Sequence, residues 1–460
     1  MSAEIAQKDT PAPVTVAKGG RGSSGVYELI VKREIVASEQ RGVDWTSMPL
    51  NEAVLINPPT KLLRGESYPF VDMAAISAGR RNVEANEDRI FAGGGSRFKD
   101  GDTLMARITP CLENGKIARF KAVSDACVGH GSTEFIVLRG KPGVSDSAFA
   151  YYLATEPSFH AFAVSQMTGT SGRQRVPTNA LGSYMVQLPP LAEQKRIASI
   201  LGALDDKIEL NRRMNAKLED MARALFKSWF VDLDPLRAKL DGRPPAGMDA
   251  AIAALFPDAF EESALGLIPK GWEALPVGDV VECVGGSTPS TAVPSYWEGG
   301  THHWTTPKDF STLQSPILLD TSRKITYSGL KQISSGLLPA GTLLMSSRAP
   351  VGYLAISVMP VAINQGFIAM KCNAKASNYF MLNWCQTNML EIEVRATGTT
   401  FAEISKQNFR PILLLLPSME VVASFTAIVE PLYEQITINL NHSQTLSKLR
   451  DSLLPMLLNR

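Results

Sequence analysis

Histidine and cysteine are the side chains that most often bind metals in proteins, and their spacing in this chain predicts no metal site. The five histidines include no His-Glu-x-x-His arrangement. His302 and His303 are neighbours in an expected loop, where their rings would point in different directions. The five cysteines contain no Cys-x-x-Cys pair, and their odd number favours reduced thiols in a cytoplasm. A Gly-x-x-x-x-Gly-Lys-Ser/Thr loop for ATP is also absent.

Two short fragments resemble parts of an adenine methyltransferase site. Asn57–Thr60 is similar to the Asn-Pro-Pro-aromatic loop of those enzymes, and Phe91–Gly95 is similar to their Phe-x-Gly-x-Gly cofactor loop. In the first fragment Thr60 cannot stack on a flipped adenine as an aromatic ring does. The second fragment follows polar residues and runs into a strand-like segment, whereas a cofactor loop should follow an apolar strand and open a helix. We interpret both as surface turns and predict no catalytic residue and no cofactor in this chain.

The side chains best suited to bind DNA lie in a loop at Thr168–Arg175, with the sequence Thr-Gly-Thr-Ser-Gly-Arg-Gln-Arg. Arginine can pair with guanine through two hydrogen bonds and glutamine with adenine, while threonines suit phosphates. A related segment, Thr397–Phe401, offers hydroxyls but no arginine. We predict DNA contacts from these loops and nearby strands, with a solvated surface charge as the alternative for each residue. The candidates are Arg80, Arg81, Arg97, Lys99, Arg107, Arg173, Gln174, Arg175, Lys308, Arg348, Thr397, Thr399, Thr400 and Lys406.

The elements that must position these residues occur twice in the chain. Four landmarks recur in the same order with shifts of 227 to 240 residues, which indicates an internal duplication. The aligned segments are Trp45–Val54 with Trp272–Val281, Gly101–Met105 with Gly341–Met345, Thr168–Ser171 with Thr397–Thr400, and Val186–Pro189 with Leu414–Pro417.

Each copy begins with a mixed α/β domain. Short alternating runs between glycine and proline turns, such as Thr103–Ile108 and Glu134–Leu138, are typical of strands. A helical stretch follows near the end of each domain, from Ser147 to about Ala163 and from Ser377 to about Glu393. The fold class is therefore predicted as α/β (α+β), with two globular domains in the chain.

Each copy ends in a long helix with a heptad pattern, which is typical of a coiled-coil seam. An asparagine lies at the same step of both seams, Asn211 and Asn439, and is best explained as fixing the register against a partner helix. The alternative is that each helix is buried against its own domain. Gly202 should weaken the first helix, and Pro431 and Pro455 should bend or shorten the second. The seam residues are Ile197, Leu201, Leu204, Ile208, Asn211, Asn215, Leu218, Ala222, Leu225 and Trp229, then Phe425, Val429, Leu432, Ile436, Asn439, Ser443, Leu446, Arg450, Leu453 and Leu457.

We predict that the two helices pack as an antiparallel coiled coil. A helix of roughly 40 residues is about 60 Å long, so the pair would act as a rigid spacer with one globular domain at each end, related by a pseudo-twofold axis. Such a molecule would suit two half-sites on a DNA duplex. The predicted segments are a disordered extension at 1–25, domains at 26–188 and 268–416, helices at 189–231 and 417–460, and between the copies a linker with one short helix at 232–267.

Several segments closely resemble the specificity (S) subunit family of type I restriction–modification systems. The resemblance covers nearly everything after about residue 40, and it depends on the order and spacing of the segments rather than on one motif. The segments are Leu188–Asn211, Leu225–Asp232, Leu255–Ser263, Gly266–Trp272, Arg107–Lys116 and Tyr296–Gly300.

This resemblance implies two target-recognition domains joined by two conserved helices. Each domain would read one half of a bipartite DNA site, and the helices would dock modification subunits, two in number, that bind S-adenosylmethionine and methylate adenine. Restriction subunits could then join. The second helix has Val421-Val422 where the first has Glu193-Gln194, so its docking site is expected to be weaker or differently built.

Composition limits the function classes only loosely. The formal net charge is +1, so a DNA-binding surface must be local. No apolar run approaches the ~20 residues that span a bilayer, and no signal peptide is recognisable, so we expect a cytoplasmic protein with no membrane partner.

We therefore predict a DNA-binding specificity subunit that is not itself an enzyme. The alternatives are a DNA methyltransferase in its own right and a coiled-coil adaptor with no role on DNA.

Overall fold

The computed structural model describes residues 44–123, 128–170, 172–398 and 402–458, and the chain divides into two compact units. Unit 1 contains the chain up to Asp206 together with the segment from Thr445 onward, and unit 2 is Lys207–Gln444. The predicted extension at 1–25 and the candidates Thr399 and Thr400 lie outside the described residues.

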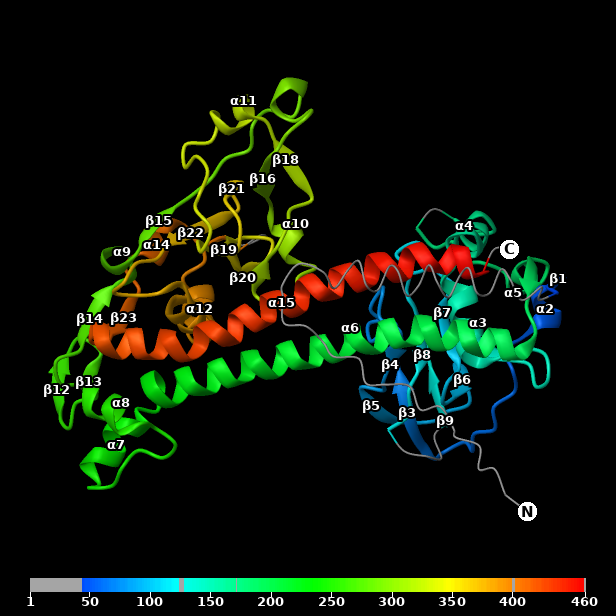
Figure 1. Ribbon diagram of the computed structural model, residues 1–460, viewed down its shortest axis with the longest axis horizontal. Coiled ribbons are helices and arrows are strands. Elements are labelled where there is room, and N and C mark those ends of the chain that lie inside the picture. Colours follow the sequence, from blue (N-terminus) through cyan, green and yellow to red (C-terminus); the bar gives the residue numbers. More distant parts are fainter. Residues whose placement is uncertain (1–43, 124–127, 171, 399–401, 459–460) are drawn as a thin grey trace, which may run out of the picture. The chain divides into compact units, whose positions relative to one another are not determined.

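Unit 1 is built on a five-stranded sheet of order β2-β10-β7-β8-β4 (Figure 1). A four-stranded sheet, β5-β3-β9-β6, and the antiparallel pair β1-β11 complete its strands. The strands are β1 (Thr46–Pro49), β2 (Val54–Ile56), β3 (Ser67–Val71), β4 (Asn82–Val83), β5 (Glu87–Ile90), β6 (Ser96–Lys99), β7 (Thr103–Ala106), β8 (Ile117–Phe120), β9 (Val128–Gly131), β10 (Phe135–Gly140) and β11 (Met185–Leu188). The short helices are α2 (Leu50–Ala53), α3 (Ser147–Thr155), α4 (Pro157–Ser165) and α5 (Thr178–Gly182).

Unit 2 repeats this plan with a five-stranded sheet of order β15-β22-β19-β20-β17, a three-stranded sheet, β18-β16-β21, and the pair β14-β23. Its strands are β14 (Glu273–Pro276), β15 (Glu282–Val284), β16 (His302–Thr305), β17 (Ile317–Leu318), β18 (Arg323–Ile325), β19 (Leu343–Ser347), β20 (Val351–Ser357), β21 (Val361–Ile363), β22 (Phe367–Lys371) and β23 (Leu413–Leu416). The helices are α9 (Val277–Val280), η2 (Pro294–Tyr296), α10 (Pro307–Phe310), α11 (Tyr327–Leu330), α12 (Asn378–Thr387), α13 (Met389–Val394) and α14 (Lys406–Phe409).

The duplication predicted from four sequence landmarks extends to strand pairing. In both units the last strand of the domain pairs antiparallel with the first, as Thr46 pairs with Leu188 and Glu273 with Leu416. One edge strand of each five-stranded sheet pairs in parallel with its neighbour, β4 with β8 and β17 with β20. The predicted fold class, with two α/β domains built on one repeat, is confirmed.

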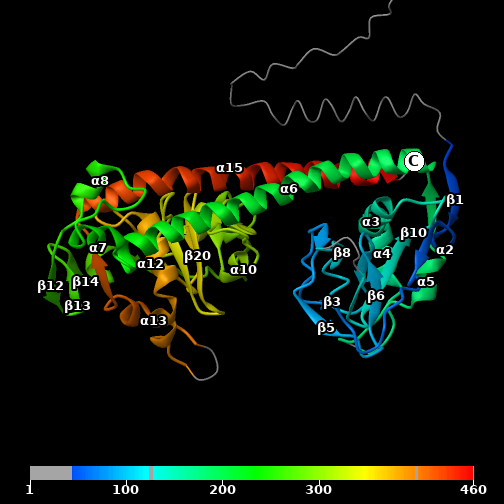
Figure 2. The same ribbon diagram turned by 90° about the horizontal axis from the view of Figure 1, so that it is seen from below.

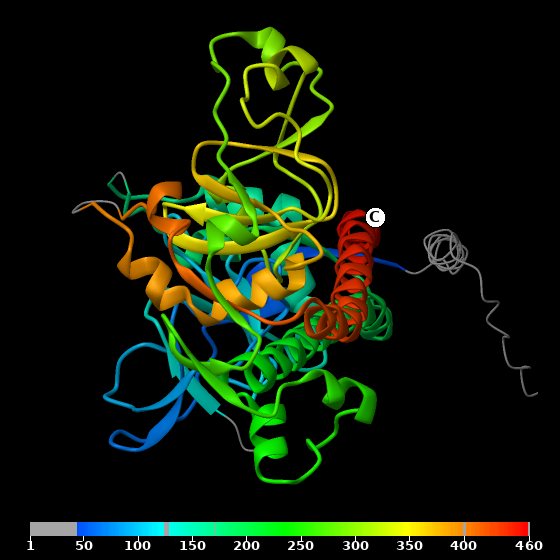
Figure 3. The same cartoon turned by 90° about the vertical axis from the view of Figure 1, so that its left-hand side faces the viewer.

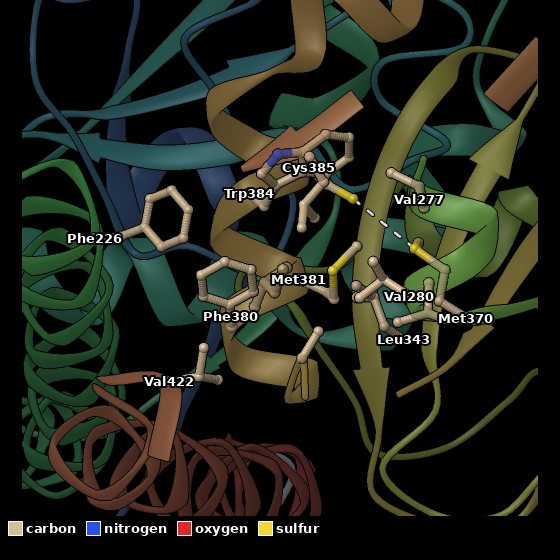
Figure 4. Close-up of a cluster of buried hydrophobic side chains, with 14 of the residues drawn as sticks. Phe226, Val277, Val280, Leu343, Met370, Phe380, Met381, Trp384, Cys385 and Val422 are labelled. Carbon is tan, nitrogen blue, oxygen red and sulfur yellow. Dashed lines mark hydrogen bonds between the residues drawn. The ribbon is translucent and has the colours of Figure 1, made fainter. Parts of the chain in front are cut away.

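One helix packs across each five-stranded sheet. In unit 1, α3 covers β7, β8 and β10, and in unit 2, α12 covers β19 and β20. Figure 4 shows the core of unit 2, where Phe380 and Met381 of α12 lie between the sheet residues Leu343 and Met370 and the helix residues Phe226 and Val422. The burial of apolar side chains on both sides of α12 joins the long helices to the domain core.

Each single helix predicted near the end of a domain is two helices in the structure. In unit 1, α3 ends before Glu156, whose carboxylate caps α4, and Pro157 opens α4. Proline suits this first position because the amide there has no helical partner. In unit 2, Asn388 separates α12 from α13.

The two long helices are α6 (Leu191–Phe226) and α15 (Met419–Leu458), and both contribute residues to both units. They lie side by side in Figures 1, 2 and 3. In unit 2 they run antiparallel, since Asn215 contacts Asn439 while Phe226 contacts Phe425. Every residue predicted for the two seams is buried or half-buried. The antiparallel packing of the helices is thereby confirmed.

The alternative interpretation, burial of each helix against its own domain, also describes part of the structure. In unit 2 the end of α6 and the start of α15 belong to the same hydrophobic cluster as the sheet and α12. In unit 1, Tyr152 of α3 donates a hydrogen bond to Asp205 of α6 at 2.7 Å. The helices therefore pack on each other and on the domains.

The seam asparagines contact one another in unit 2. Asn439 donates from Nδ2 to Oδ1 of Asn215 at 2.8 Å, and Asn211 donates to the Asn439 carbonyl at 3.4 Å and to Ser443 at 3.2 Å. All three asparagines are nearly fully buried, with 1–3% of their surface exposed.

The expected defects of the helices have different outcomes. Gly202 lies where Arg81 approaches, since a Cβ there would be 2.9 Å from its Nη1 atom. This glycine lets Arg81 reach the backbone of α6. Pro431 and Pro455 do not shorten α15, which is assigned as one helix from Met419 to Leu458.

The segment between the copies contains more structure than the one short helix predicted. The predicted apolar run forms α8 (Ala250–Leu255), and a second helix, α7 (Asp234–Leu240), precedes it with Pro235 in its first turn. A hairpin of β12 (Phe260–Ser263) and β13 (Gly266–Pro269) follows. The end of α6 continues as one π-helical turn, η1 (Lys227–Val231), whose Trp229 and Phe230 are buried. Pro235 does not prevent α7, because proline is tolerated at the start of a helix.

Of the Glu193-Gln194 pair of the first helix, Glu193 is half-buried and the glutamine is internal. Gln194 is fully buried, accepts a hydrogen bond from the Asp146 amide at 2.9 Å, and donates to the carbonyls of Val144 and Pro189. Its counterpart Val422 is buried in the core of unit 2. Because Gln194 and Val422 are both internal, their difference belongs to the two domain cores, and the expected weaker or differently built docking site of the second helix stays a prediction.

No helix among the described residues is both long and apolar enough to cross a membrane.

Candidate nucleic-acid interface

In both units the same pair of backbone hydrogen bonds closes a loop at its first threonine. In unit 1, Thr168 and Arg175 exchange backbone hydrogen bonds of 2.8 and 3.0 Å, and in unit 2, Thr397 and Glu403 exchange two of 2.9 Å. We call residues 168–175 and 397–403 the TGT loops. Each loop pairs with the residue that precedes a Pro-containing turn, Arg175 with Ile108 and Glu403 with Arg348. The two loops therefore share one backbone frame.

In unit 1 this frame brings Arg107 close to the TGT loop. The Arg107 carbonyl accepts from the Val176 amide at 2.9 Å, and its amide donates to the Glu134 carbonyl at 2.9 Å. Arg175 donates to the Glu134 carboxylate from Nε and Nη2 at 2.7–3.0 Å. These hydrogen bonds lower the pKa of Glu134. The carboxylate is thus ionised and engaged by Arg175.

In unit 2 the same backbone bonds are made by Ser347, not by Arg348. The Ser347 carbonyl accepts from the Ile404 amide at 3.0 Å, and its amide donates to Gly366 at 2.8 Å. Arg348 instead matches Ile108 of unit 1 and lies 3.4 Å from the Glu403 carboxylate. Arg107 and Arg348, grouped by sequence as residues near equivalent strands, therefore occupy different places in the shared frame.

Arg348 and Lys308 line one pocket of unit 2, of about 440 Å³. Thr306, Ser311 and Asn364 also line it, and no carboxylate does. Two cations among hydroxyl and amide groups suit a phosphate.

The other candidates are distributed over both units. Arg97 and Lys99 lie exposed on β6, and Arg173 is exposed in the TGT loop. The Gln174 backbone holds Thr109 through bonds of 2.9–3.1 Å. Arg80 is half-buried before β4, Thr397 is exposed, and Lys406 begins α14.

Arg81 is a correction to the predicted set. Its guanidinium donates to the Gly202 carbonyl at 2.9 Å and pairs with Asp206, and only 14% of its side chain is exposed. This packing turns the charge toward α6. Arg81 therefore serves the fold of unit 1 and is withdrawn as a DNA contact.

Sequence reasoning missed a cation–aromatic stack in unit 2. The guanidinium of Arg323 lies 3.6 Å from the ring centroid of Trp297 and 5.3 Å from that of Trp304. Arginine above an indole ring is favourable, and such stacks are common where nucleic acid binds. The sequence features that could have indicated this stack are the two tryptophans and the basic pair at 323–324 that follows them.

The two methyltransferase-like fragments are not separate surface turns, as the sequence suggested. Asn57 and Thr60 of the first and Gly95 of the second line one pocket of about 410 Å³ in unit 1, together with Arg97 and Arg107. Strand β6 follows the second fragment, where a cofactor loop would open a helix.

Metal and thiol chemistry have no assembled site in the part of the chain that is described. No group of three or more histidine, cysteine, aspartate or glutamate residues there could hold a metal ion. Burial raises the pKa of Cys283 to about 11 and that of Cys372 to about 12, which keeps both thiols protonated.

Comparison with known proteins identifies the duplicated unit. Residues 45–220 and 269–448 each match the family described as type I restriction modification DNA specificity domain. The chain belongs to this specificity family. The two matches coincide with the two copies of the repeat, so each α/β domain with its helix is one specificity domain.

Relatives of the specificity family match either most of the chain or about a third of it. The HindI specificity subunit of Haemophilus influenzae is 26% identical over 79% of this chain and 86% of its own length. The MjaIX specificity subunit of Methanocaldococcus jannaschii is 36% identical over 35% of this chain and 38% of its own length. A crystal structure of an S subunit from M. genitalium has the same fold, with a TM-score of 0.50 and 15% identity over 91% of this chain and 97% of the other.

Proposed function

We propose that this chain is the DNA-reading subunit of a type I restriction–modification complex and catalyses no reaction itself. The observation that carries the proposal is the presence of two specificity domains built on one strand order. Each unit presents the same frame of TGT loop and Pro-containing turn with different side chains. Two such domains would read two different half-sites of one bipartite sequence.

Specificity in this proposal comes from the side chains on the shared frame. Unit 1 carries Arg107 and an Arg175–Glu134 pair, whereas unit 2 carries Ser347 and an Arg348–Glu403 pair. Phosphate contacts position a protein on DNA and base contacts specify the sequence. Different charges at matching places therefore give the two domains different preferences.

The long helices are the proposed docking surface for two modification subunits, which would bind S-adenosylmethionine and methylate adenine; restriction subunits would join the same complex. Leu210, Met214 and Met221 of α6 are 54%, 37% and 49% exposed in unit 2. Their spacing places them on one helix face, and an exposed apolar stripe favours a protein partner.

The test of the function is a map of methylated adenines in genomic DNA with and without this gene. A two-part motif present in the wild type should disappear on deletion. Unchanged methylation would contradict the proposal. The isolated chain is expected to bind no S-adenosylmethionine, and saturable binding would favour a methyltransferase instead. A duplex bound with a steep salt dependence excludes an adaptor with no role on DNA.

The docking surface is tested by Met214→Glu, which places a charge in the apolar stripe. Co-purification with the modification subunit should fall strongly. Ala216→Glu, an exposed position of the same helix outside the stripe, is the matched control and should leave co-purification unchanged.

A further inference from the structure

The pocket lined by both methyltransferase-like fragments offers mainly hydrogen-bond donors. Asn57 has a positive φ of 49°, and its Oδ1 accepts from the Val137 amide at 2.9 Å. A backbone amide can only donate, so the amide is oriented with Nδ2 left as a donor. Thr60 Oγ1 accepts from Arg139 at 2.9 Å, which leaves its hydroxyl hydrogen to donate.

Two guanidinium groups add positive charge to this pocket. Arg97 donates to the Gly93 carbonyl at 3.2 Å and lies 4.9 Å from the ring centroid of Phe91, with further N–H groups remaining. The Nε atom of Arg107 is buried and has no hydrogen-bond partner among the described residues. A buried donor without a partner is costly, and a ligand in this pocket would supply the missing acceptor to Arg107.

The nearest carboxylate is already engaged. The Glu134 carboxylate accepts hydrogen bonds from Nε and Nη2 of Arg175, at 2.7–3.0 Å. No acidic side chain lines the pocket itself. Arg175 is thus the main partner of Glu134, and Arg107 adds only a smaller electrostatic attraction to that carboxylate, with no hydrogen bond from its Nε atom.

We propose that this pocket of unit 1 binds a phosphodiester of the DNA, with Arg107 and Arg97 as its cationic contacts and Asn57 and Thr60 as neutral donors. The inference rests on the proposed function and assigns a DNA contact to named residues. A phosphate presents only acceptors, which matches the free groups of the site. The volume of about 410 Å³ admits the sugar attached to that phosphate.

S-adenosylmethionine and a flipped adenine, the other ligands of a restriction–modification complex, fit this pocket less well than a phosphate. A ribose diol is commonly held by an acidic side chain, and adenine presents an amino group that needs an acceptor. S-adenosylmethionine also carries cationic groups, which two guanidiniums repel. The same two fragments that resemble a methyltransferase thus line a site of the opposite electrostatic character.

Unit 2 places a neutral residue at the position that Arg107 occupies in unit 1. Ser347 holds the place of Arg107 in the shared backbone frame. The proposed contact therefore belongs to one half-site only, which makes its loss detectable on one side of the recognition sequence.

The test measures binding of the full-length chain to a DNA duplex over a range of salt concentrations. The duplex carries the recognition motif that methylation mapping identifies. Arg107→Gln should weaken binding about tenfold and reduce the slope of log K against log salt by about one. Arg107→Lys should retain the slope, because a phosphate accepts either cation. Arg243→Gln, which removes an exposed cation of the segment between the copies, should change neither quantity.

A scan with single neutral methylphosphonates then locates the contact. For the wild type, one methylphosphonate in the half-site of unit 1 should weaken binding about tenfold. For Arg107→Gln, the same methylphosphonate should cause no further loss of affinity. The inference is overturned if the double variant Arg97→Gln/Arg107→Gln keeps the affinity and the salt slope of the wild type. It is also overturned if Arg107→Lys weakens binding as much as Arg107→Gln does and the protein no longer discriminates at one base pair. That second outcome would assign Arg107 to a base. If the wild-type chain binds no duplex, the proposed function fails and this inference with it.

Discussion

Asp205 is a buried carboxylate that joins three elements of unit 1. It is 5% exposed, accepts from the Tyr152 hydroxyl of α3 at 2.7 Å, and pairs with Arg450 of α15 at 2.7 Å. Arg450 occupies a seam position that the heptad pattern reserves for an apolar residue. Its pairing with Asp205 explains how a cation is tolerated there, because a buried charge needs a hydrogen-bonded partner.

Removing that carboxylate should destabilise the fold. Asp205→Ala leaves Arg450 buried without its main partner, and we expect a loss of about 3–5 kcal/mol in the free energy of unfolding. Urea denaturation followed by circular dichroism measures the change. Asp220→Ala removes an exposed carboxylate of α6 and should cost less than about 1 kcal/mol. Equal losses in the two variants would contradict this account of Asp205.

The stability of unit 1 is expected to depend on pH through the Glu134 carboxylate. The Arg175 hydrogen bonds hold the pKa of Glu134 below its ordinary value of 4.5. A carboxyl with a lowered pKa in the folded state contributes stability above pH 4.5, and this contribution is lost as the pH falls through the folded-state pKa.

Glu134→Gln should therefore make the free energy of unfolding fall less steeply as the pH is lowered. The difference in unfolding free energy between pH 7 and pH 3 is expected to shrink by less than about 1 kcal/mol, because the pair is partly exposed. The variant should also bind random duplex more tightly at low salt, since Arg175 is released. Denaturation at the two pH values and a salt titration check the two effects, and an unchanged dependence of stability on pH would show that the pair contributes nothing.

At the scale of elements, the asparagine cluster makes the helix pairing specific. Asn211, Asn215 and Asn439 form hydrogen bonds in the seam of unit 2 and are almost fully buried. A buried polar group in a helix seam costs stability when shifted from its partner. We propose that this cluster selects the register of α6 and α15.

Asn439→Leu should lower the free energy of unfolding by about 1–3 kcal/mol, because it leaves the buried Oδ1 of Asn215 without the donor that it has in the wild type. The triple variant Asn211→Leu/Asn215→Leu/Asn439→Leu should regain that stability or exceed the wild type. Asn441→Leu, on the exposed face of α15, is the control and should change stability by less than about 0.5 kcal/mol. Urea denaturation distinguishes these outcomes; a single variant as stable as the wild type would remove the cluster's proposed role.

At the scale of the whole molecule, the repeat predicts separable reading of the two half-sites. Exchange of residues 268–416 for the matching domain of another specificity subunit should change one half of the methylated motif and leave the other half intact. The reason is that each domain has its own sheet, TGT loop and hydrophobic core. Methylation mapping of cells carrying the chimaera measures this. A change in both halves at once would show that the domains do not read independently.

The periodic features of the chain were predictable from sequence alone. The duplication, the strand–helix order of each copy, the long helices and their seams all follow from patterns that repeat at short spacing or at a shift near 230 residues. Such patterns can be found by comparing residue types along the chain at a fixed spacing, so no knowledge of side-chain contacts is needed to reveal them. The polar seam positions Asn211 and Asn439 were identifiable for the same reason.

Which arginine is free was decided only by the tertiary structure. Arg175 meets Glu134, Arg348 meets Glu403, and Arg81 meets Asp206, each across 41 to 125 residues of sequence. A charge pair depends on distances of a few ångströms between side chains, and no short pattern in the chain records them. The sequence by itself therefore determined the two-domain specificity fold, while folding decided that the Nε atom of Arg107 lies without a hydrogen-bond partner beside a pocket of donors.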